Sequence, residues 1–399
     1  MPGWLWRLLI ALTLTQTAAF IVRPALTYRA LDLGASDLMV GLLVAVYAFL
    51  PALSAVPIGR YCDRHRPGPM FVAGTVLLAI GSAALAFAPD LVTVTLATVV
   101  LGMGAMIIMV GSQSVIARIS AEDDLDRDFG MLSAAASIGQ MVGPLLTGFI
   151  LTHDTGAVAA TAIAFGAGAA LCLVALAFSA RYPDAHDAGA TDTQPATWAD
   201  TVGILGRRGV PGAMMASVSL LATVDLLIAY LPVIGERAGI SPAVVGILLS
   251  LRAATSVLSR LLVGVLVRRF SRVQLIGAST VVTAVLVPAL AFIPNPWILG
   301  VVLTVLGLFL GLGQPLTMTV VTTAVPQNFR SAALAVRVLG NKSGQVALPA
   351  VIASATTVGG LGGGFALLGV VLGGAAIAGM VSKPAPSTGA GPIAIGPDQ

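Results

Sequence analysis

Six ionisable side chains fall inside long apolar stretches of the sequence, where a charge is costly unless it faces a cavity or a partner. Five are cations and one is an acid: Arg23, Asp225, Arg252, Arg260, Arg337 and Lys342. A guanidinium can bind both oxygens of a carboxylate or a phosphate in one plane. The excess of cations therefore favours a buried site for an anion over a buried site for a cation.

Three of the polar residues share one face of a predicted helix, because they recur at four-residue spacing: Arg337, Asn341 and Gln345. A guanidinium flanked by side-chain amides suits a carboxylate or a phosphate. The alternative is a structural polar network that ties this helix, the eleventh, to the eighth or the tenth. The spacing alone is compatible with both interpretations.

Asp225 and Arg252 lie near the middle of two consecutive apolar stretches, so a buried ion pair between them is as plausible as a ligand site. Such a pair could open and close during a working cycle, or it could be purely structural. Arg23 shares a helix face with Gln16, and the alternative to a ligand contact is that Arg23 extends to the nearer membrane surface. We expect Arg260 to extend to the surface in that way.

Gln113 and Tyr230 are assigned to the same candidate cavity. The Tyr230 hydroxyl could bind a ligand, although tyrosine is also common near membrane interfaces. The two cysteines are isolated and have no metal-ligand spacing, so neither a disulfide nor a metal site is expected. The three histidines fall in predicted loops without partners at catalytic spacing, so the chain is predicted not to be an enzyme.

The elements that carry these side chains are unusually apolar. Of the 399 residues, 57% are hydrophobic and only 10% are charged, and the mean hydropathy is +0.98. Soluble domains usually carry about 25% charged residues, so we predict an all-α membrane protein. The first apolar stretch lacks a small-residue cleavage site and is followed by others, which indicates a membrane helix and not a removed signal peptide.

Twelve apolar stretches are long enough to cross a bilayer as helices. They cover residues 5–28, 38–58, 70–88, 93–117, 129–151, 156–179, 211–234, 242–267, 273–293, 297–321, 331–355 and 361–381. Of the 21 Lys and Arg residues, fourteen fall in loops on the side of the termini and two on the opposite side. This asymmetry predicts cytoplasmic termini. It also explains the formal charge of +4 without any nucleic-acid partner.

The chain is predicted to divide into two membrane-embedded halves. An N-terminal six-helix bundle covers 1–180, and a C-terminal six-helix bundle covers 211–382. The segment 181–210 is polar and rich in turn-forming residues, which indicates a cytoplasmic linker. The tail 383–399 is rich in Pro, Gly and Ala and is expected to be disordered.

Two landmarks of the first half recur in the second half at one offset. Gly264 lies 205 residues after Gly59, and Gly344 lies 205 residues after Gly139. A shared offset at two separate places indicates a duplicated unit.

The stretch Gly59-x-x-x-Asp63-Arg64 follows the second helix and resembles the loop 2–3 signature of the major facilitator superfamily. The resemblance implies twelve helices in two pseudo-symmetric six-helix bundles. It also implies a conformational gate at this motif, where Gly59 allows close helix approach and Asp63 accepts hydrogen bonds from a helix N-terminus. Gly264 is assigned to the corresponding gate of the second half.

In the fifth helix, Gly139, Gly143 and Pro144 have the spacing of the antiporter signature of the same superfamily. Thr147 stands where that signature usually has a glycine. The motif implies a kinked helix that approaches the eighth helix closely, and it accompanies export by exchange. Thr98 stands where proton-coupled drug exporters of the family carry an arginine, so their usual coupling residue is missing.

The resemblance implies a secondary transporter that moves a small organic molecule by alternating access, without a cofactor or a nucleotide-binding motif. With the embedded cations, it favours export of an organic anion or amphipathic compound, coupled to protons. The alternative is proton-coupled uptake of a carboxylate or another small metabolite, and a minor alternative is a non-transporting membrane sensor. We expect a monomer in the lipid bilayer of a bacterial inner membrane.

Overall fold

The computed structural model describes residues 3–64, 67–120, 125–152, 157–179, 210–323 and 330–381. These residues form helices and contain no strand, which confirms the predicted all-α class for this part of the chain. Eleven of the described helices are long and apolar enough to cross a membrane. They are α1 (Gly3–Asp32), α2 (Asp37–Arg64), α3 (Pro67–Ala86), α4 (Leu91–Ile119), α5 (Leu125–Thr152), α6 (Ala157–Ser179), α8 (Val210–Arg237), α9 (Pro242–Leu266), α10 (Arg272–Ala289), α11 (Pro296–Thr323) and α12 (Arg330–Val381).

The last helix, α12, covers both of the final two predicted stretches in 52 residues. Its backbone is not helical at Gly360, where φ is 60° and ψ is −162°. Beyond this point Gly364 lies against Ile352 and Thr356, which in a straight helix would be about 18 Å and 12 Å away. The chain therefore bends back at Gly360, and the two final predicted stretches lie on the two sides of this bend.

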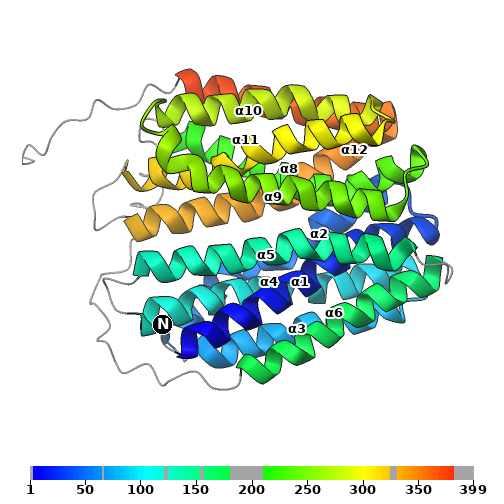
Figure 1. Cartoon of the computed structure of the whole chain (residues 1–399), viewed down its shortest axis with the longest axis horizontal. Coiled ribbons are helices and arrows are strands. Elements are labelled where there is room, and N and C mark those ends of the chain that lie inside the picture. Colours follow the sequence, from blue (N-terminus) through cyan, green and yellow to red (C-terminus); the bar gives the residue numbers. More distant parts are fainter. Residues whose placement is uncertain are drawn as a thin grey trace, which may run out of the picture.

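The helices pack as two groups that Figure 1 shows one above the other. The N-terminal group consists of α1 to α6, and the C-terminal group consists of α8 to α12. The groups meet mainly where α2 packs on α12 and where α5 packs on α9, with smaller contacts of α1 and α2 with α8. Residues 181–209 of the predicted linker and the predicted tail lie outside the described residues.

The turn after the first helix of each group has the same geometry. Gly34 after α1 has φ +79° and Gly239 after α8 has φ +66°, a backbone region that favours glycine. In each turn the next residue donates a backbone hydrogen bond to a carbonyl five residues earlier, at 2.9 Å and 2.8 Å respectively. The two glycines are separated by 205 residues, so this geometry supports the predicted duplication.

A close helix crossing repeats at the same offset. A Cβ at Gly102 of α4 would collide with the backbone carbonyl of Tyr47 in α2, and a Cβ at Gly307 of α11 would collide with that of Arg252 in α9. Glycine permits backbones to approach to this distance in a membrane bundle. Tyr47 and Arg252 therefore occupy equivalent places in the two groups.

Local capping explains where several helices begin. The Asp90 carboxylate accepts a hydrogen bond from the Thr93 amide at 2.8 Å, which starts α4. This bond lowers the pKa of Asp90, because it stabilises the charged form. Ser271 and Gln274 cap α10 in the same reciprocal way.

Candidate functional site

An ion pair joins the two groups of helices in the middle of the molecule. Arg23 of α1 donates to Asp225 of α8, with 2.6 Å between Nη2 and Oδ1. Each side chain is only 12% exposed. The predicted pair of Asp225 with Arg252 is therefore wrong for this conformation, because Arg23 points inward and occupies the carboxylate. For the same reason, Arg23 does not extend to the membrane surface.

Aromatic rings and an amide complete the surroundings of this pair. The Arg23 guanidinium carbon lies 5.0 Å from the ring centre of Tyr47 and 5.4 Å from that of Phe20. Such cation–π contacts stabilise a desolvated guanidinium. The Gln345 amide of α12 donates to the second Asp225 oxygen at 2.8 Å, so both carboxylate oxygens have partners.

Lys342 adds a further positive charge to this central cluster, which we define as Arg23, Asp225, Lys342 and Gln345. Its ammonium donates to the Gln345 side-chain oxygen at 3.0 Å. It also interacts electrostatically with Asp225 and Arg23. A single acid therefore faces two cations within the cluster.

The space beside the cluster is small in this conformation. A cavity of about 20 Å³ is lined by Arg23, Tyr47, Asp225 and apolar residues of α1, α2 and α8. This volume holds about one water molecule. An organic ligand would need the two groups to separate or rotate before it could contact Asp225 from this side.

Arg252 lies deep in α9 and is only 3% exposed. Within the part of the chain that the structure describes, its guanidinium makes no hydrogen bond or ion pair, and its Nε is buried without a partner. Its charge interacts with those of Asp225, Arg23 and Arg260. Arg252 is therefore a buried cation near the central cluster whose charge no acid neutralises directly.

Arg260, two turns further along α9, donates to the Ser137 hydroxyl of α5 at 3.1 Å. The expectation that Arg260 extends to the membrane surface is therefore wrong, because the close approach of α5 and α9 supplies a partner inside the protein. Ser256 lies between the two arginines and is also buried. Sequence reasoning missed Ser256, although its four-residue spacing from Arg252 and Arg260 places it on their face of the helix.

The polar stripe on α12 is engaged by neighbouring helices. Arg337 donates to the Gln314 side-chain oxygen at 2.5 Å and to the Thr317 hydroxyl at 3.3 Å, both on α11. Asn341 accepts a hydrogen bond from Ser217 of α8 at 3.0 Å. These contacts favour the alternative in which Arg337 and Asn341 form a structural polar network between helices. The partner helix of Arg337, α11, is the tenth of the predicted helices. Gln345 belongs instead to the central cluster.

Gln16 and Gln113 are not brought into the central cluster. Gln16 packs against Gly139, where its Cβ lies 2.5 Å from the position that a glycine Cβ would occupy. Gln113 of α4 is exposed. Neither amide has a hydrogen bond to another described residue, so neither shares the contacts of Asp225.

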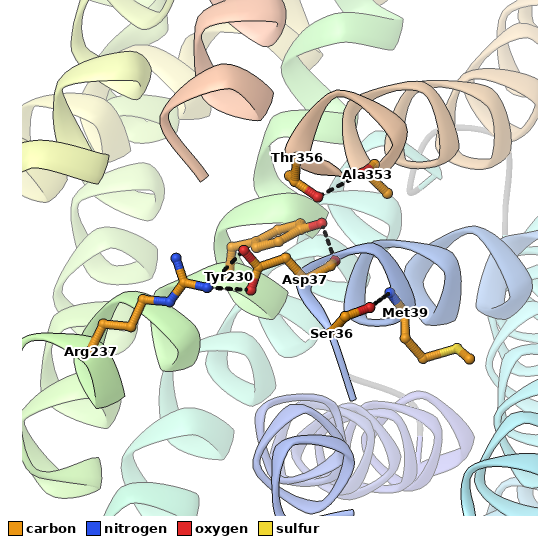
Figure 2. Close-up of polar contacts among 7 residues, drawn as sticks. All are labelled: Ser36, Asp37, Met39, Tyr230, Arg237, Ala353 and Thr356. Atoms are coloured by element: carbon orange, nitrogen blue, oxygen red, sulfur yellow. Dashed lines mark hydrogen bonds and ion pairs between the residues drawn. The ribbon is translucent and has the colours of Figure 1, made fainter. Parts of the chain in front are cut away.

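A second ion pair joins the groups at the end where α1 stops and α2 begins, which we call the far end. Figure 2 shows Tyr230 and Arg237 of α8 reaching Asp37 at the start of α2. Arg237 contacts both Asp37 oxygens at 2.8 Å, and the Tyr230 hydroxyl donates to the Asp37 carbonyl at 2.8 Å. In this conformation the Tyr230 hydroxyl is thus engaged by the backbone of α2.

The far-end contact is close-packed and borders a pocket. A Cβ at Gly41 of α2 would lie 2.5 Å from the Tyr230 hydroxyl and would collide with Ala353 of α12. A pocket of about 620 Å³ opens beside Asp37 and Arg237 and is also lined by α12 residues such as Thr356. Sequence reasoning missed this pair. The available signal was that Arg237 is one of only two basic residues predicted opposite the termini.

The predicted gate residues at the ends of α2 and α9 make no close helix contact that the structure describes. Gly59, Asp63 and Arg64 lie on the last turns of α2, and their side chains lie outside the described part of the structure. Gly264 of α9 is exposed and has no atom within 4 Å of the position of a Cβ. Its packing therefore provides no close approach of the kind expected at a gate.

The predicted close approach of α5 to the eighth helix, α9, is present, but Gly139 and Gly143 do not make it. Gly139 and Gly143 contact α1, where a Cβ would lie 2.5 Å from the Cβ atoms of Gln16 and Phe20. The expected approach to the eighth helix, α9, is made instead by the Pro144 carbonyl, which touches Gly246. The glycines lie on a different face of α5 from Pro144, so they bind α5 to its own group.

The described residues contain no group of three or more His, Cys, Asp or Glu side chains that could hold a metal ion. Cys172 is buried and free.

Comparison with known proteins identifies relatives among membrane transporters. The chain is 29% identical to the inner membrane transport protein YajR of Escherichia coli K12 over 38% of this chain and 33% of that protein. It is 29% identical to the multidrug resistance protein MdtH of Enterobacter sp. 638 over 43% of this chain and 42% of that protein. The matched region thus spans less than half the length of either relative.

Solved structures share the fold over nearly the whole chain. The nucleoside transporter NupG superposes with a TM-score of 0.77 at 15% identity, covering 95% of this chain and 99% of that one. A D-xylose-proton symporter gives 0.75 at 16% identity, covering 94% and 95%. The family model described as Major Facilitator Superfamily matches residues 8–241 and 213–396. The chain therefore belongs to the major facilitator superfamily of transporters.

Proposed function

We propose that the protein is a secondary active transporter that exports a small organic anion or amphipathic compound by alternating access, coupled to protons. The observation that carries this proposal is the buried Arg23–Asp225 pair, which joins the N-terminal and C-terminal groups at the middle of the molecule. In an alternating-access cycle the two groups rock about a central site. A contact that must break when they separate is suited to control that motion.

The conformation described here suits one half of such a cycle. At the far end, the groups are joined by Asp37–Arg237 and by the Tyr230 hydrogen bond. Nearer the middle they are joined by Arg23–Asp225. With the predicted cytoplasmic termini, the far end faces the periplasm, so this conformation is closed toward the periplasm.

The charges around the centre support an anionic substrate. Arg23, Lys342 and Arg252 interact electrostatically with the single acid Asp225, so three cations surround one carboxylate. Excess buried charge is costly, and an anion that enters the site would reduce that cost. The relative MdtH is named as a multidrug resistance protein, and one structural neighbour is a proton symporter; these names support export and proton coupling respectively.

The proposal includes twelve membrane crossings. The bend at Gly360 would give α12 two crossings and the chain twelve in all, arranged as two six-helix bundles with cytoplasmic termini. The protein would act as a monomer in a bacterial inner membrane. Proton-coupled uptake of a carboxylate uses the same charges in the opposite direction, so direction must be measured.

Everted membrane vesicles from cells that produce the protein provide the test. With an acidic interior, they should accumulate labelled benzoate or succinate, and a protonophore should abolish the accumulation. Accumulation by right-side-out vesicles instead would support uptake. Accumulation of ethidium but of neither anion would contradict the anionic substrate class, and no accumulation of any of the three compounds would support the sensor alternative.

Leu261→Ala is a suitable control for variants of α9, because Leu261 is 76% exposed and lies outside the polar face of that helix. This variant should retain the activity of the unmodified protein. Vesicles from cells without the protein give the background.

A further inference from the structure

The central cluster leaves one buried cation, Arg252, without a partner among the described residues. Arg260 and Arg337 are also embedded, but each donates hydrogen bonds to a neighbouring helix. A buried charge with no partner costs several kcal/mol in general, so it indicates a function that uses the free charge. The question is what Arg252 binds, and when.

Asp225 is the acid that could pair with Arg252, and the two residues lie in the same group of helices. Asp225 lies on α8 and Arg252 on α9, which both belong to the C-terminal group and contact each other. Arg23 lies on α1 in the N-terminal group. When the groups separate at the far end, Arg23 moves away from Asp225, whereas Arg252 stays in the group of helices that carries this carboxylate and interacts with it electrostatically.

The internal repeat relates Asp225 and Arg252 to two aromatic residues of the N-terminal group. Phe20 and Tyr47 lie 205 residues before Asp225 and Arg252 respectively, and so occupy the equivalent places in the N-terminal group. Both rings reach the same guanidinium carbon of Arg23, at 5.4 Å and 5.0 Å. Side chains at these two places of the N-terminal group therefore share one neighbour, Arg23.

We propose that Asp225 exchanges Arg23 for Arg252 when the far end opens, and that Arg252 binds a carboxylate or phosphate group of the substrate while Arg23 holds Asp225. This inference rests on the proposed function, because it assigns the anionic substrate to one side chain. The exchange also determines in which conformation the anion is bound and in which it is released. The anion binds when the far end is closed, and Asp225 displaces it when Arg23 leaves.

Arg23 can change the affinity of Arg252 for an anion without touching the substrate. One carboxylate can neutralise only one of the two arginines fully. In the closed conformation Arg23 takes that carboxylate, so an anion gains the full attraction of Arg252. In the open conformation the anion must compete with Asp225, which is held beside Arg252 by the same group of helices. A ligand can shift a conformational equilibrium only through such a difference in affinity.

A double-mutant cycle tests the exchange without knowledge of the substrate. In the otherwise unchanged protein, Arg252→Gln should leave the melting temperature in detergent unchanged or raise it, because it removes an unpaired buried charge. In the Arg23→Gln background, Arg252→Gln should lower the melting temperature, because Arg252 has then become the partner of Asp225. Equal effects of Arg252→Gln in both backgrounds would overturn the exchange.

Two further variants guard against simple misfolding. Arg23→Lys keeps a positive charge beside Asp225 and should retain the response of the unmodified protein to Arg252→Gln. Asp225→Asn in the Arg23→Gln background removes the carboxylate for which Arg252 would compete. In that double variant, Arg252→Gln should again fail to lower the melting temperature, and a decrease would count against the exchange.

The anion role has its own measurement, with benzoate and inorganic phosphate as probes at matched ionic strength. At least one of them should raise the melting temperature of the unmodified protein. That increase should be lost in Arg252→Gln and in Arg23→Gln, and should return in Arg23→Gln with Asp225→Asn. Stabilisation that survives Arg252→Gln, or no stabilisation by either probe, would overturn the anion role of Arg252.

The failure of this inference can be distinguished from failure of the proposed function. Transport of benzoate or succinate together with equal effects of Arg252→Gln in both backgrounds would leave the transporter proposal standing and remove the exchange. A cycle with the predicted change of sign, in a protein that transports neither anion, would keep the exchange and remove the anionic substrate.

Discussion

The two ion pairs that join the groups of helices differ in nearly every physical property. Arg23–Asp225 is 12% exposed on both sides and is surrounded by two aromatic rings and the Gln345 amide. Asp37–Arg237 has two contacts of 2.8 Å, both from one Arg237 nitrogen, but the Arg237 side chain is 56% exposed. Burial, and not the number of contacts, therefore distinguishes the two pairs.

Because of this difference in burial, the two pairs are expected to contribute different free energies to the closed conformation. An exposed pair contributes about 0.2–1 kcal/mol and weakens with salt. Removing one member of a buried pair costs about 3–5 kcal/mol, because it leaves an uncompensated charge. The far-end pair thus aligns the two groups at little cost to their separation, whereas the central pair makes separation depend on what replaces Arg23.

The largest expected effect comes from breaking the central pair. Arg23→Met should lower the free energy of unfolding by about 3 kcal/mol, because Asp225 keeps its charge in a buried position. Thermal unfolding of the purified protein in detergent measures this change. Asp225→Asn in the same molecule should recover part of the loss. If Arg23→Met costs no more than Leu261→Ala, the pair is not energetically important.

A smaller effect is expected from overpacking the far end. Gly41→Val places methyl groups where Ala353 and the Tyr230 hydroxyl already lie, and overpacking of this kind typically costs about 1–3 kcal/mol. It should also open the far end, which labelling of a cysteine introduced at Thr356, buried in this conformation, would report as a faster reaction. Gly264→Ala is the matched control for stability, because a Cβ there meets open space. Equal stability of the two variants would contradict the close packing at Gly41.

The Tyr230 hydroxyl provides a third, smaller contrast. Tyr230→Phe keeps the edge-to-face contact with Phe365, at 5.8 Å between ring centres, and removes only the hydrogen bond to the Asp37 carbonyl. The expected loss of unfolding free energy is about 1 kcal/mol. The apparent KM for the transported anion should not change. An increase in KM with unchanged stability would return Tyr230 to the ligand-binding role that its sequence position suggested.

The sequence predicted the elements well because a bilayer imposes length and hydropathy on every crossing. The gap expected between residues 355 and 361 coincides with the bend at Gly360. The offset of 205 residues, found from two motifs, also relates the turns at Gly34 and Gly239. These features depend on local chemistry and on repetition, which a single sequence displays directly.

Pairings between helices could not be obtained in the same way. Embedded charge drew attention to Arg23 and Asp225, but the pairing considered for Asp225 was with Arg252, whereas Asp225 contacts Arg23. Which arginine reaches Asp225 depends on the rotation of α1 against α8, and spacing within one helix does not determine this. Gly139 illustrates the same limit, because a glycine permits close approach without specifying the helix that approaches.

The smallest expected effect concerns the far-end pair itself. A double-mutant cycle with Asp37→Asn and Arg237→Gln should give a coupling energy of about 0.5 kcal/mol at low ionic strength, because the Arg237 side chain is 56% exposed. In 1 M salt, where the Debye length is about 3 Å, most of this coupling should disappear. The Arg23–Asp225 coupling, measured in the same way with Arg23→Met and Asp225→Asn, should persist because its surroundings exclude ions. Equal salt dependence of the two couplings would contradict the distinction between a buried central pair and an exposed far-end pair.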